Sequence, residues 1–156
     1  MTGSDPSDED QAGNSARRGR RRYVLDQQVG FLLRQAQQRH LSIFSSLMAE
    51  GLTAQQFAAL VKLAEAGPSS QNSLGRQTAM DNSTINGVVK RLIQRGLIEK
   101  FPSDEDHRLH MLRLTAEGMR VHDRVMSLAI EITRLTLAPL GRGEQTTLLR
   151  LLRKIG

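Results

Sequence analysis

The side chains with the clearest chemical pattern lie between residues 82 and 95. Apolar residues recur there at helical spacing: Ile85, Val88, Val89 and Leu92. The opposite side of the same helix carries hydroxyl, amide and cationic groups: Ser83, Asn86, Gly87, Lys90, Arg91 and Gln94. Short hydroxyl and amide groups can hydrogen bond with base edges in a major groove, and Lys and Arg can hold phosphates. This face therefore predicts contact with duplex DNA, against the alternative of an ordinary solvated helix face.

The rest of the sequence offers little for catalysis. No Ser-His-Asp order, glycine-rich phosphate loop, HExxH motif or pair of carboxylates stands out. The absence of cysteine excludes disulfides, thiolate catalysis and every cysteine-containing zinc site. We therefore expect neither enzymatic activity nor a cofactor nor a metal centre. His107 and His110 with Asp104 and Asp106 leave a metal-sensing regulator as one alternative.

Two short helices and a hairpin are expected to position the polar face. A helix over 70–78 is followed by a break at Ala79 and Met80, after which Asp81 or Asn82 can cap a helix that runs to Arg95. Gly96 ends that helix, and the alternating runs 97–101 and 109–114 predict a β-hairpin with a polar loop. This order is that of a winged helix-turn-helix lobe, which we place at residues 53–114.

Longer helices are expected on both sides of the lobe. One spans about 25–48 and stops at Gly51, and Thr53 with Gln56 forms a capping box for the next helix, whose inward residues should be Phe57, Leu60, Val61 and Ala64. From Thr115 onward, apolar residues form a heptad seam that requires a partner helix: Val121, Val125, Leu128, Ile132 and Leu135. A last helix carries Leu148, Leu151, Leu152 and Ile155.

Composition agrees with a mainly α fold that has one small β-hairpin wing. Apolar residues make up 38% of the 156-residue chain and aromatic residues only 3%, so aliphatic side chains must build the core. Residues 1–22 lack apolar periodicity and end in an arginine cluster, which predicts a flexible tail. No apolar run is long enough to span a bilayer and no signal segment is seen, so we expect a cytoplasmic protein.

The segment 52–118 resembles the MarR family of transcription regulators. The resemblance is sharpest in GLIEK (96–100), in the wing pair Asp106 and Arg108, and in LRLTAEG (112–118). It implies that the helix 82–95 enters the major groove and that Arg108 reaches the adjacent minor groove. The expected DNA-binding residues are Ser70, Gln71, Asn72, Asn82, Ser83, Thr84, Asn86, Lys90, Arg91 and Arg108.

The resemblance also implies a homodimer that binds a pseudo-palindromic operator, acts most often as a repressor, and forms its interface from residues 23–52 and 115–156. The family places an effector pocket between these helices and the DNA lobe. The segment 29–44 is similar to a branch that controls aromatic-acid degradation, which implies an aromatic acid or its coenzyme A thioester as the effector. The expected effector-binding residues are Arg34, His40, Phe44, Met48 and Phe57.

Two readings of His40 stay open, because this residue lies on an apolar stripe between Ala36 and Ile43. It can anchor the polar end of a bound acid, or it can be a core histidine satisfied by a backbone carbonyl. A second alternative concerns the whole lobe, since winged helices also serve protein–protein contacts. The polar and cationic outer face of 83–94 argues against that use, which favours exposed apolar residues.

Overall fold

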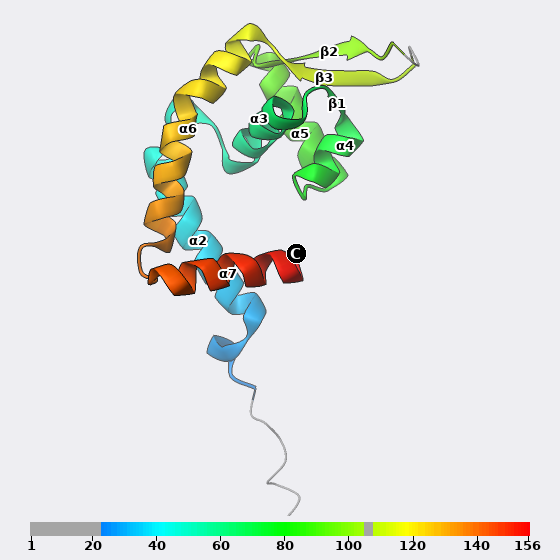
Figure 1. Cartoon of the computed structure of the whole chain (residues 1–156). Coiled ribbons are helices and arrows are strands. Elements are labelled where there is room, and N and C mark those ends of the chain that lie inside the picture. The colour runs from blue at the N-terminus through cyan, green and yellow to red at the C-terminus, as the bar shows by residue number, and fades with distance from the viewer. Residues whose placement is uncertain (1–22, 105–107) are drawn as a thin grey trace, which may run out of the picture. The chain divides into compact units, whose positions relative to one another are not determined.

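The computed structural model describes residues 23–104 and 108–156. The predicted tail (1–22) and Asp106 therefore lie outside the described residues. The chain divides into two compact units, Met1–Ala36 and Gln37–Gly156. The elements follow in the order η1 (Leu25–Gln27), α2 (Val29–Leu47), η2 (Ala49–Gly51), α3 (Ala54–Ala66), β1 (Ser69–Ser70), α4 (Gln71–Gln77), α5 (Asn82–Gln94), β2 (Ile98–Pro102), β3 (His110–Leu114), α6 (Ala116–Leu137) and α7 (Arg142–Ile155) (Figure 1). Within the described residues, no helix is both long and apolar enough to cross a bilayer.

Side-chain caps set the helix starts of the winged helix-turn-helix. The predicted capping box opens α3, with Gln56 N donating to Thr53 Oγ1 (3.2 Å) and Thr53 N donating to Gln56 Oε1 (3.1 Å). Asp81 caps α5 by accepting from Thr84 N, and Thr115 caps α6 by accepting from Gly118 N. Each cap satisfies a backbone N–H that has no partner within its helix. These local signals explain why the starts of α3, α5 and α6 agree with the sequence.

The first predicted helix begins later in the structure than the sequence indicates. Gln28 is extended (ψ 130°), which separates the single turn of η1 from α2. After Leu47 the chain forms the short η2, in which Glu50 and Gly51 both have positive φ (65° and 60°). A left-handed backbone at Glu50 is uncommon for a residue with a Cβ and carries no obvious pattern in a single sequence. The helix ends at Leu47, one residue from the predicted end at 48, and η2 joins it to Gly51.

The sheet has three strands in the order β1-β3-β2, one more than predicted. β2 pairs antiparallel with β3, with Ile98 opposite Leu114 and Phe101 opposite Met111, and this pair forms the wing hairpin (Figure 1). The added strand, β1, pairs Ser69 and Ser70 with β3. Two residues are too few to show the alternation by which a strand is recognised in sequence.

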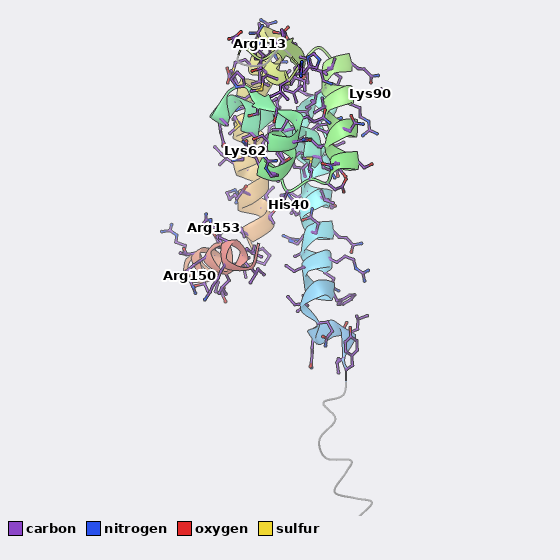
Figure 2. The ribbon with its side chains drawn as sticks, turned by 90° about the vertical axis from the view of Figure 1, so that its right-hand side faces the viewer. His40, Lys62, Lys90, Arg113, Arg150 and Arg153 are labelled. Carbon is purple, nitrogen blue, oxygen red and sulfur yellow. The ribbon has the colours of Figure 1, made fainter. Side chains whose placement is uncertain are left out.

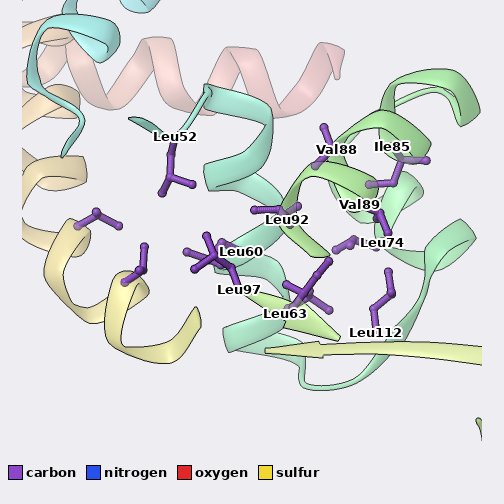
Figure 3. Close-up of a cluster of buried hydrophobic side chains, with 14 of the residues drawn as sticks. Leu52, Leu60, Leu63, Leu74, Ile85, Val88, Val89, Leu92, Leu97 and Leu112 are labelled. Carbon is purple, nitrogen blue, oxygen red and sulfur yellow. The ribbon is translucent and has the colours of Figure 1, made fainter. Parts of the chain in front are cut away.

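One aliphatic core holds the lobe together. Leu60, Leu63, Leu74, Ile85 and Leu92 converge from α3, α4 and α5 and are almost fully buried (Figure 3). On α3 the inward residues are Ala59, Leu60 and Leu63, and the predicted Phe57, Val61 and Ala64 are only half-buried. Since α3 packs against α4, α5, α6 and β3, its apolar residues surround much of the helix and do not define one face.

The heptad seam of α6 also differs from its prediction. Val121, Val125 and Ile132 are buried within this chain, where they join the same core, and α6 packs on α3 and η2. Leu128 and Leu135 are half-buried. The helices that cover most of the seam therefore belong to the same chain. Spacing alone shows that an apolar stripe needs a partner, not which chain supplies it.

The start of α6 touches the turn that follows α5. Thr115 N donates to Leu97 O (3.1 Å) and Thr115 Oγ1 donates to Gly96 O (2.6 Å). A Cβ added at the buried Gly118 would lie far inside van der Waals contact with Leu97 O. Only glycine lets these two backbones approach so closely.

We therefore predict that Gly118→Ala destabilises the fold by about 2 to 4 kcal/mol, because a rigid backbone carbonyl must move to admit the methyl group. Urea denaturation measures the loss, and Met119→Ala at the exposed neighbouring position is the control. A Gly118→Ala variant as stable as the wild type would show that the two backbones separate freely.

Candidate nucleic-acid interface and effector site

The outer face of α5 is polar and accessible. Asn82, Ser83, Asn86, Lys90 and Arg91 are all exposed, and the opposite face is buried in the core. Figure 2 shows Lys90 pointing outward from the helix. Asn82, Ser83 and Asn86 lie in the N-terminal half, while both cations lie in the C-terminal half, which ends in Gln94. Such a face can present donors and acceptors to base edges and cations to phosphates.

Thr84 has a different position from the other predicted residues of α5. Its backbone N donates to Asp81 Oδ1 (2.7 Å) and its Oγ1 donates to Asp81 Oδ2 (3.0 Å). These two hydrogen bonds lower the pKa of Asp81, the backbone one most strongly. The Thr84 hydroxyl is thus used in the cap and its proton is not available to a base edge.

The start of α4 holds the other predicted helix residues. Ser70 Oγ accepts from Ser73 N (3.2 Å) as the N-cap, so its hydroxyl proton can still be donated outward. Asn72 is exposed and Gln71 is half-buried. α4 packs against α5 through Gly75, whose added Cβ would lie 3.3 Å from Ile85 Cγ2. This small residue sets the close approach of the two helices.

The wing has its own polar ladder. Arg113 Nε donates to Glu99 Oε1 (2.7 Å), and the Arg113 guanidinium lies 4.5 Å from the centre of the Phe101 ring. Glu99 faces Arg113 in the strand register and Phe101 lies diagonal to it, so both contacts join β2 to β3 and stiffen the hairpin. Arg108 is exposed in the loop that joins the two strands. A stiff hairpin therefore carries an arginine near its tip.

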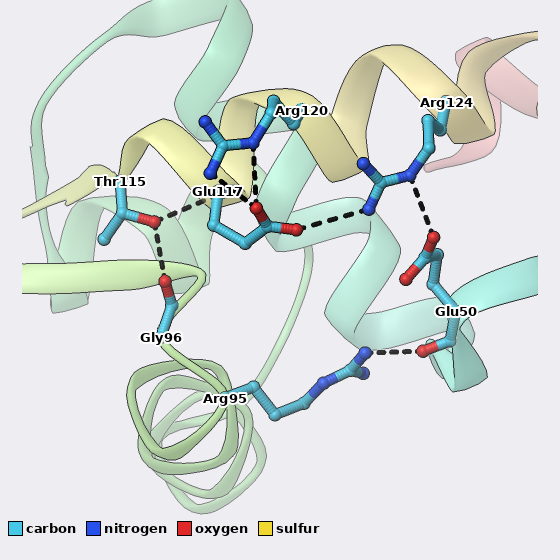
Figure 4. A network of polar contacts seen from close by, with 8 residues as sticks. Glu50, Arg95, Gly96, Thr115, Glu117, Arg120 and Arg124 are labelled. Carbon is cyan, nitrogen blue, oxygen red and sulfur yellow. Dashed lines mark hydrogen bonds and ion pairs between the residues drawn. The ribbon is translucent and has the colours of Figure 1, made fainter.

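A polar network fixes the C-terminal end of α5 (Figure 4). The Arg95 guanidinium donates to the backbone carbonyls of Glu50 and Gly51. The Glu50 carboxylate accepts from Arg124 Nε (2.9 Å). These three elements, α5, η2 and α6, are therefore held together around Glu50. Sequence reasoning missed this network, because its members are 45 and 74 residues apart and follow no pattern.

Glu117 extends the network along α6. It accepts from Arg120 Nε (2.9 Å) and from Arg124 Nη2 (3.3 Å). Hydrogen bonding to Arg120 and then to Arg124 lowers the pKa of Glu117, while hydrogen bonding to Glu50 and Glu117 raises the pKa of Arg124. The network thus favours the charged forms of Glu117 and Arg124.

His40 meets α6 at its C-terminal turn. His40 Nδ1 lies 3.0 Å from Thr136 Oγ1, and Thr136 Oγ1 donates its proton to Ile132 O (2.8 Å). Since that hydroxyl proton is already used, Nδ1 must be the donor to Thr136. The neutral imidazole then carries its proton on Nδ1, and Nε2 is the acceptor. The partner of His40 is a hydroxyl group, not the backbone carbonyl expected of a core histidine, and the ring is half-buried.

Aromatic residues continue from His40 toward α3. The His40 and Phe44 ring centres are 6.3 Å apart, and Phe57 meets Phe44 edge to face at 5.8 Å. Phe44 and Met48 are buried, and Phe44 also lines a groove of about 450 Å³ between α2 and the start of α3. The structure therefore brings together His40, Phe44 and Phe57 of the predicted effector residues.

The arginines of α2 have other contacts. The Arg34 guanidinium lies 5.5 Å from the centre of the Phe31 ring. Arg39 Nη2 donates to Leu135 O (3.1 Å), so it caps the C-terminal turn of α6. Across residues 23–104 and 108–156, no three His, Asp or Glu side chains gather in a group that could hold a metal ion.

Comparison with known proteins identifies the lobe. The profile of the MarR family matches residues 52–110. The chain is 40% identical to the HTH-type transcriptional repressor NicR of Pseudomonas putida over 134 residues, which cover 85% of each chain. The chain belongs to the MarR family. It is thus a transcription regulator and not an enzyme, as the sequence predicts.

Solved structures support the same assignment. A probable transcriptional regulator of Pseudomonas aeruginosa is 47% identical, with a TM-score of 0.83 over 85% of this chain and 100% of the other. BpsR of Bordetella bronchiseptica, whose DNA binding is regulated by 6-hydroxynicotinic acid, is 35% identical, with a TM-score of 0.82 over 85% of this chain and 96% of the other. These matches confirm the mainly α winged helix fold of this MarR-family chain.

The network predicts how stability depends on pH. The pKa of Glu117 is lowered from its ordinary value of 4.5. The carboxylate therefore adds to the free energy of unfolding above pH 4.5, and this stabilisation is lost as pH falls through the lower pKa of the folded state. The wild type should therefore be more stable than Glu117→Gln at about pH 7, and the difference should shrink below about pH 4. Thermal unfolding across this range measures the difference.

The control removes the two arginines that donate hydrogen bonds to Glu117. In an Arg120→Ala/Arg124→Ala background, Glu117→Gln should change stability little at any pH, because the donors are gone. An equal and pH-dependent difference in both backgrounds would assign the effect to another group.

Proposed function

We propose that this protein is a repressor that binds an operator in duplex DNA as a homodimer and is released by an aromatic acid. The observation that carries the proposal is the exposed polar and cationic face of α5, held by a rigid core beside a stiff wing. NicR is named a repressor, and the DNA binding of BpsR is regulated by a small acid. Both relatives support the same activity for this chain.

In this proposal α5 lies in the major groove. Asn82, Ser83 and Asn86 read base edges, and Lys90 and Arg91 hold phosphates on the groove walls. Ser70, Gln71 and Asn72 at the start of α4 contact the backbone, as the first helix of such a motif does. Thr84 acts indirectly, because its cap with Asp81 fixes the start of α5.

Arg108 enters the adjacent minor groove from the wing in the same proposal. A narrow minor groove concentrates negative potential and attracts arginine. The ladder of Glu99, Phe101 and Arg113 limits how far the hairpin can bend. The wing thus adds a contact that depends on groove shape more than on base identity.

We place the dimer interface in residues 23–52 and 115–156, and the DNA lobe in 53–114. α7 supports this division, because it has no buried residue in the single chain. Its apolar side chains are exposed: Leu149 (38%), Leu151 (45%), Leu152 (38%) and Ile155 (68%). An amphipathic helix of this kind buries its apolar face against a partner. Two lobes joined in a dimer bind two half-sites.

The DNA assignment predicts different results for two neighbouring residues. Asn86→Ala should weaken binding to a duplex selected by the wild type from a random pool by about 1 to 3 kcal/mol, with little change on scrambled DNA. Lys90→Ala should weaken both duplexes alike, because phosphates carry no sequence information. Fluorescence anisotropy at one fixed salt concentration measures both affinities.

The assignment of α5 to the major groove would be wrong if Asn86→Ala bound both duplexes with the affinity of the wild type. Should the wild type itself bind no duplex, the protein-contact use of the winged helix would replace this proposal.

For the effector we propose a hydroxylated aromatic acid that contacts His40, Phe44, Met48 and Phe57. In the neutral ring His40 Nε2 accepts a hydrogen bond from a hydroxyl group of the ligand, and in the protonated ring it donates a hydrogen bond to a carboxylate. Arg39 contributes a cation, which requires that Arg39 releases Leu135 O. A coenzyme A thioester is the larger alternative, whose phosphates need further cations. The effector must bind the DNA-incompetent arrangement more tightly, because equal affinity shifts nothing.

This effector proposal predicts a selective defect. His40→Ala should keep DNA affinity but bind 6-hydroxynicotinate at least about tenfold more weakly than the wild type, as expected when a hydrogen bond to a charged group is lost. Calorimetric titration measures the affinity, and anisotropy measures release of DNA.

Thr136→Val is the matched variant. It keeps the imidazole but removes its hydroxyl partner, so ligand affinity should fall less than in His40→Ala. If His40→Ala instead lowers the melting temperature and DNA affinity while ligand affinity is unchanged, His40 belongs to the core. A coenzyme A thioester that binds far more tightly than 6-hydroxynicotinate would identify the larger effector.

A further inference from the structure

Gly87 is a glycine in the middle of the DNA-facing helix. It is the sixth residue of the 13-residue α5, four residues after Ser83 and three before Lys90, so it lies on the same face as both. Glycine is the least favourable residue in a helix interior apart from proline. A glycine at this position therefore lowers the stability of the helix. Comparison with the other helix glycines shows whether packing within the chain requires it.

Two other helix glycines, Gly75 and Gly118, have a packing reason within the chain. A Cβ at Gly75 would lie 3.3 Å from both Ile85 Cγ2 and Met80 O, and a Cβ at Gly118 would clash with Leu97 O. A Cβ at Gly87 would meet no atom within 4 Å, and its φ is not in the left-handed region. Neither packing nor backbone conformation in this chain requires glycine at position 87.

The missing side chain also leaves a gap in the polar face. Ser83, Lys90 and Arg91 lie one turn from position 87 and Asn86 directly precedes it, and all four residues are exposed. No side chain covers the helix backbone at Gly87, while the side chains around it extend away from the helix. A second surface can therefore come closer to the backbone here than elsewhere on the face.

We propose that Gly87 is the point of closest approach between α5 and the floor of the major groove. This inference rests on the proposed function and adds a residue that sets how deeply the helix enters. A side-chain-bearing helix is about as wide as the groove, so a single added Cβ facing the floor lifts the helix. Lifting it lengthens the hydrogen bonds of the short Ser83 and Asn86 side chains, while the longer Lys90 and Arg91 adapt.

The test is a pair of measurements that move in opposite directions. Gly87→Ala should raise the melting temperature by about 2 to 4 °C, because alanine favours the helix and nothing in the chain opposes its methyl group. The same variant should bind the selected duplex at least about tenfold more weakly, since base contacts are lost. Its affinity for scrambled DNA should change far less, because phosphate contacts persist.

Two further variants serve as controls. Glu65→Ala places alanine at an exposed position of α3, outside the proposed DNA-binding and dimer surfaces, and it should leave DNA affinity unchanged. Gly87→Leu extends the side chain, and it should weaken binding to the selected duplex more than Gly87→Ala does. An affinity for the selected duplex that falls as the side chain at position 87 grows, and that the control does not change, indicates steric exclusion.

The outcomes separate this inference from the proposed function. If the wild type selects a duplex and Gly87→Ala binds it equally well, the close approach is wrong and DNA binding stands. If Gly87→Ala lowers the melting temperature, glycine serves the fold and the inference is also wrong. If the wild type selects no duplex at all, the proposed function itself fails.

Discussion

The close backbone contact between Gly118 and Leu97 is the constraint on which the DNA lobe depends. Leu97 follows the last turn of α5 and precedes β2, so its carbonyl lies where the helix and the wing meet. Thr115 donates to this carbonyl from the start of α6, and Gly118 leaves the space that the carbonyl needs. One contact thus fixes the helix, the wing and α6 relative to one another. Because it joins backbone to backbone, side-chain adjustment cannot restore it once it is lost.

Glu50 brings η2 into the same assembly. Its backbone carbonyl accepts from Arg95 at the end of α5, and its carboxylate accepts from Arg124 in α6. The residue has a left-handed backbone, which a non-glycine residue adopts only where its surroundings compensate. The proposed effector residues Phe44 and Met48 lie on the segment that leads into η2. Met48 is thus two residues from Glu50, which is hydrogen bonded to both α5 and α6.

Much of the lobe could be predicted from sequence because its signals are local. The capping box of Thr53 and Gln56, the cap at Asp81 and the turn at Gly96 each involve residues within one or two turns of each other. The parts that escaped prediction depend on distant residues. Arg95 and Glu50 are far apart in sequence, β1 is too short for a pattern, and the seam of α6 has its partners within the chain. Thr84 and Ser70 also take part in helix caps. Because a hydroxyl suits a cap and a base edge equally well, the residue type alone does not separate the two roles.

The distribution of charge along α5 agrees with a DNA-facing role. A carboxylate at the N-terminal end, Asp81, would ordinarily repel phosphates. Here both of its oxygens accept hydrogen bonds from Thr84, and the positive end of the helix dipole offsets its charge. The exposed side chains that follow are neutral, and Lys90 and Arg91 appear only toward the C-terminal end, where cations stabilise the helix. The order of charges that favours the helix therefore also leaves its N-terminal half neutral for base edges and its C-terminal half positive for phosphates.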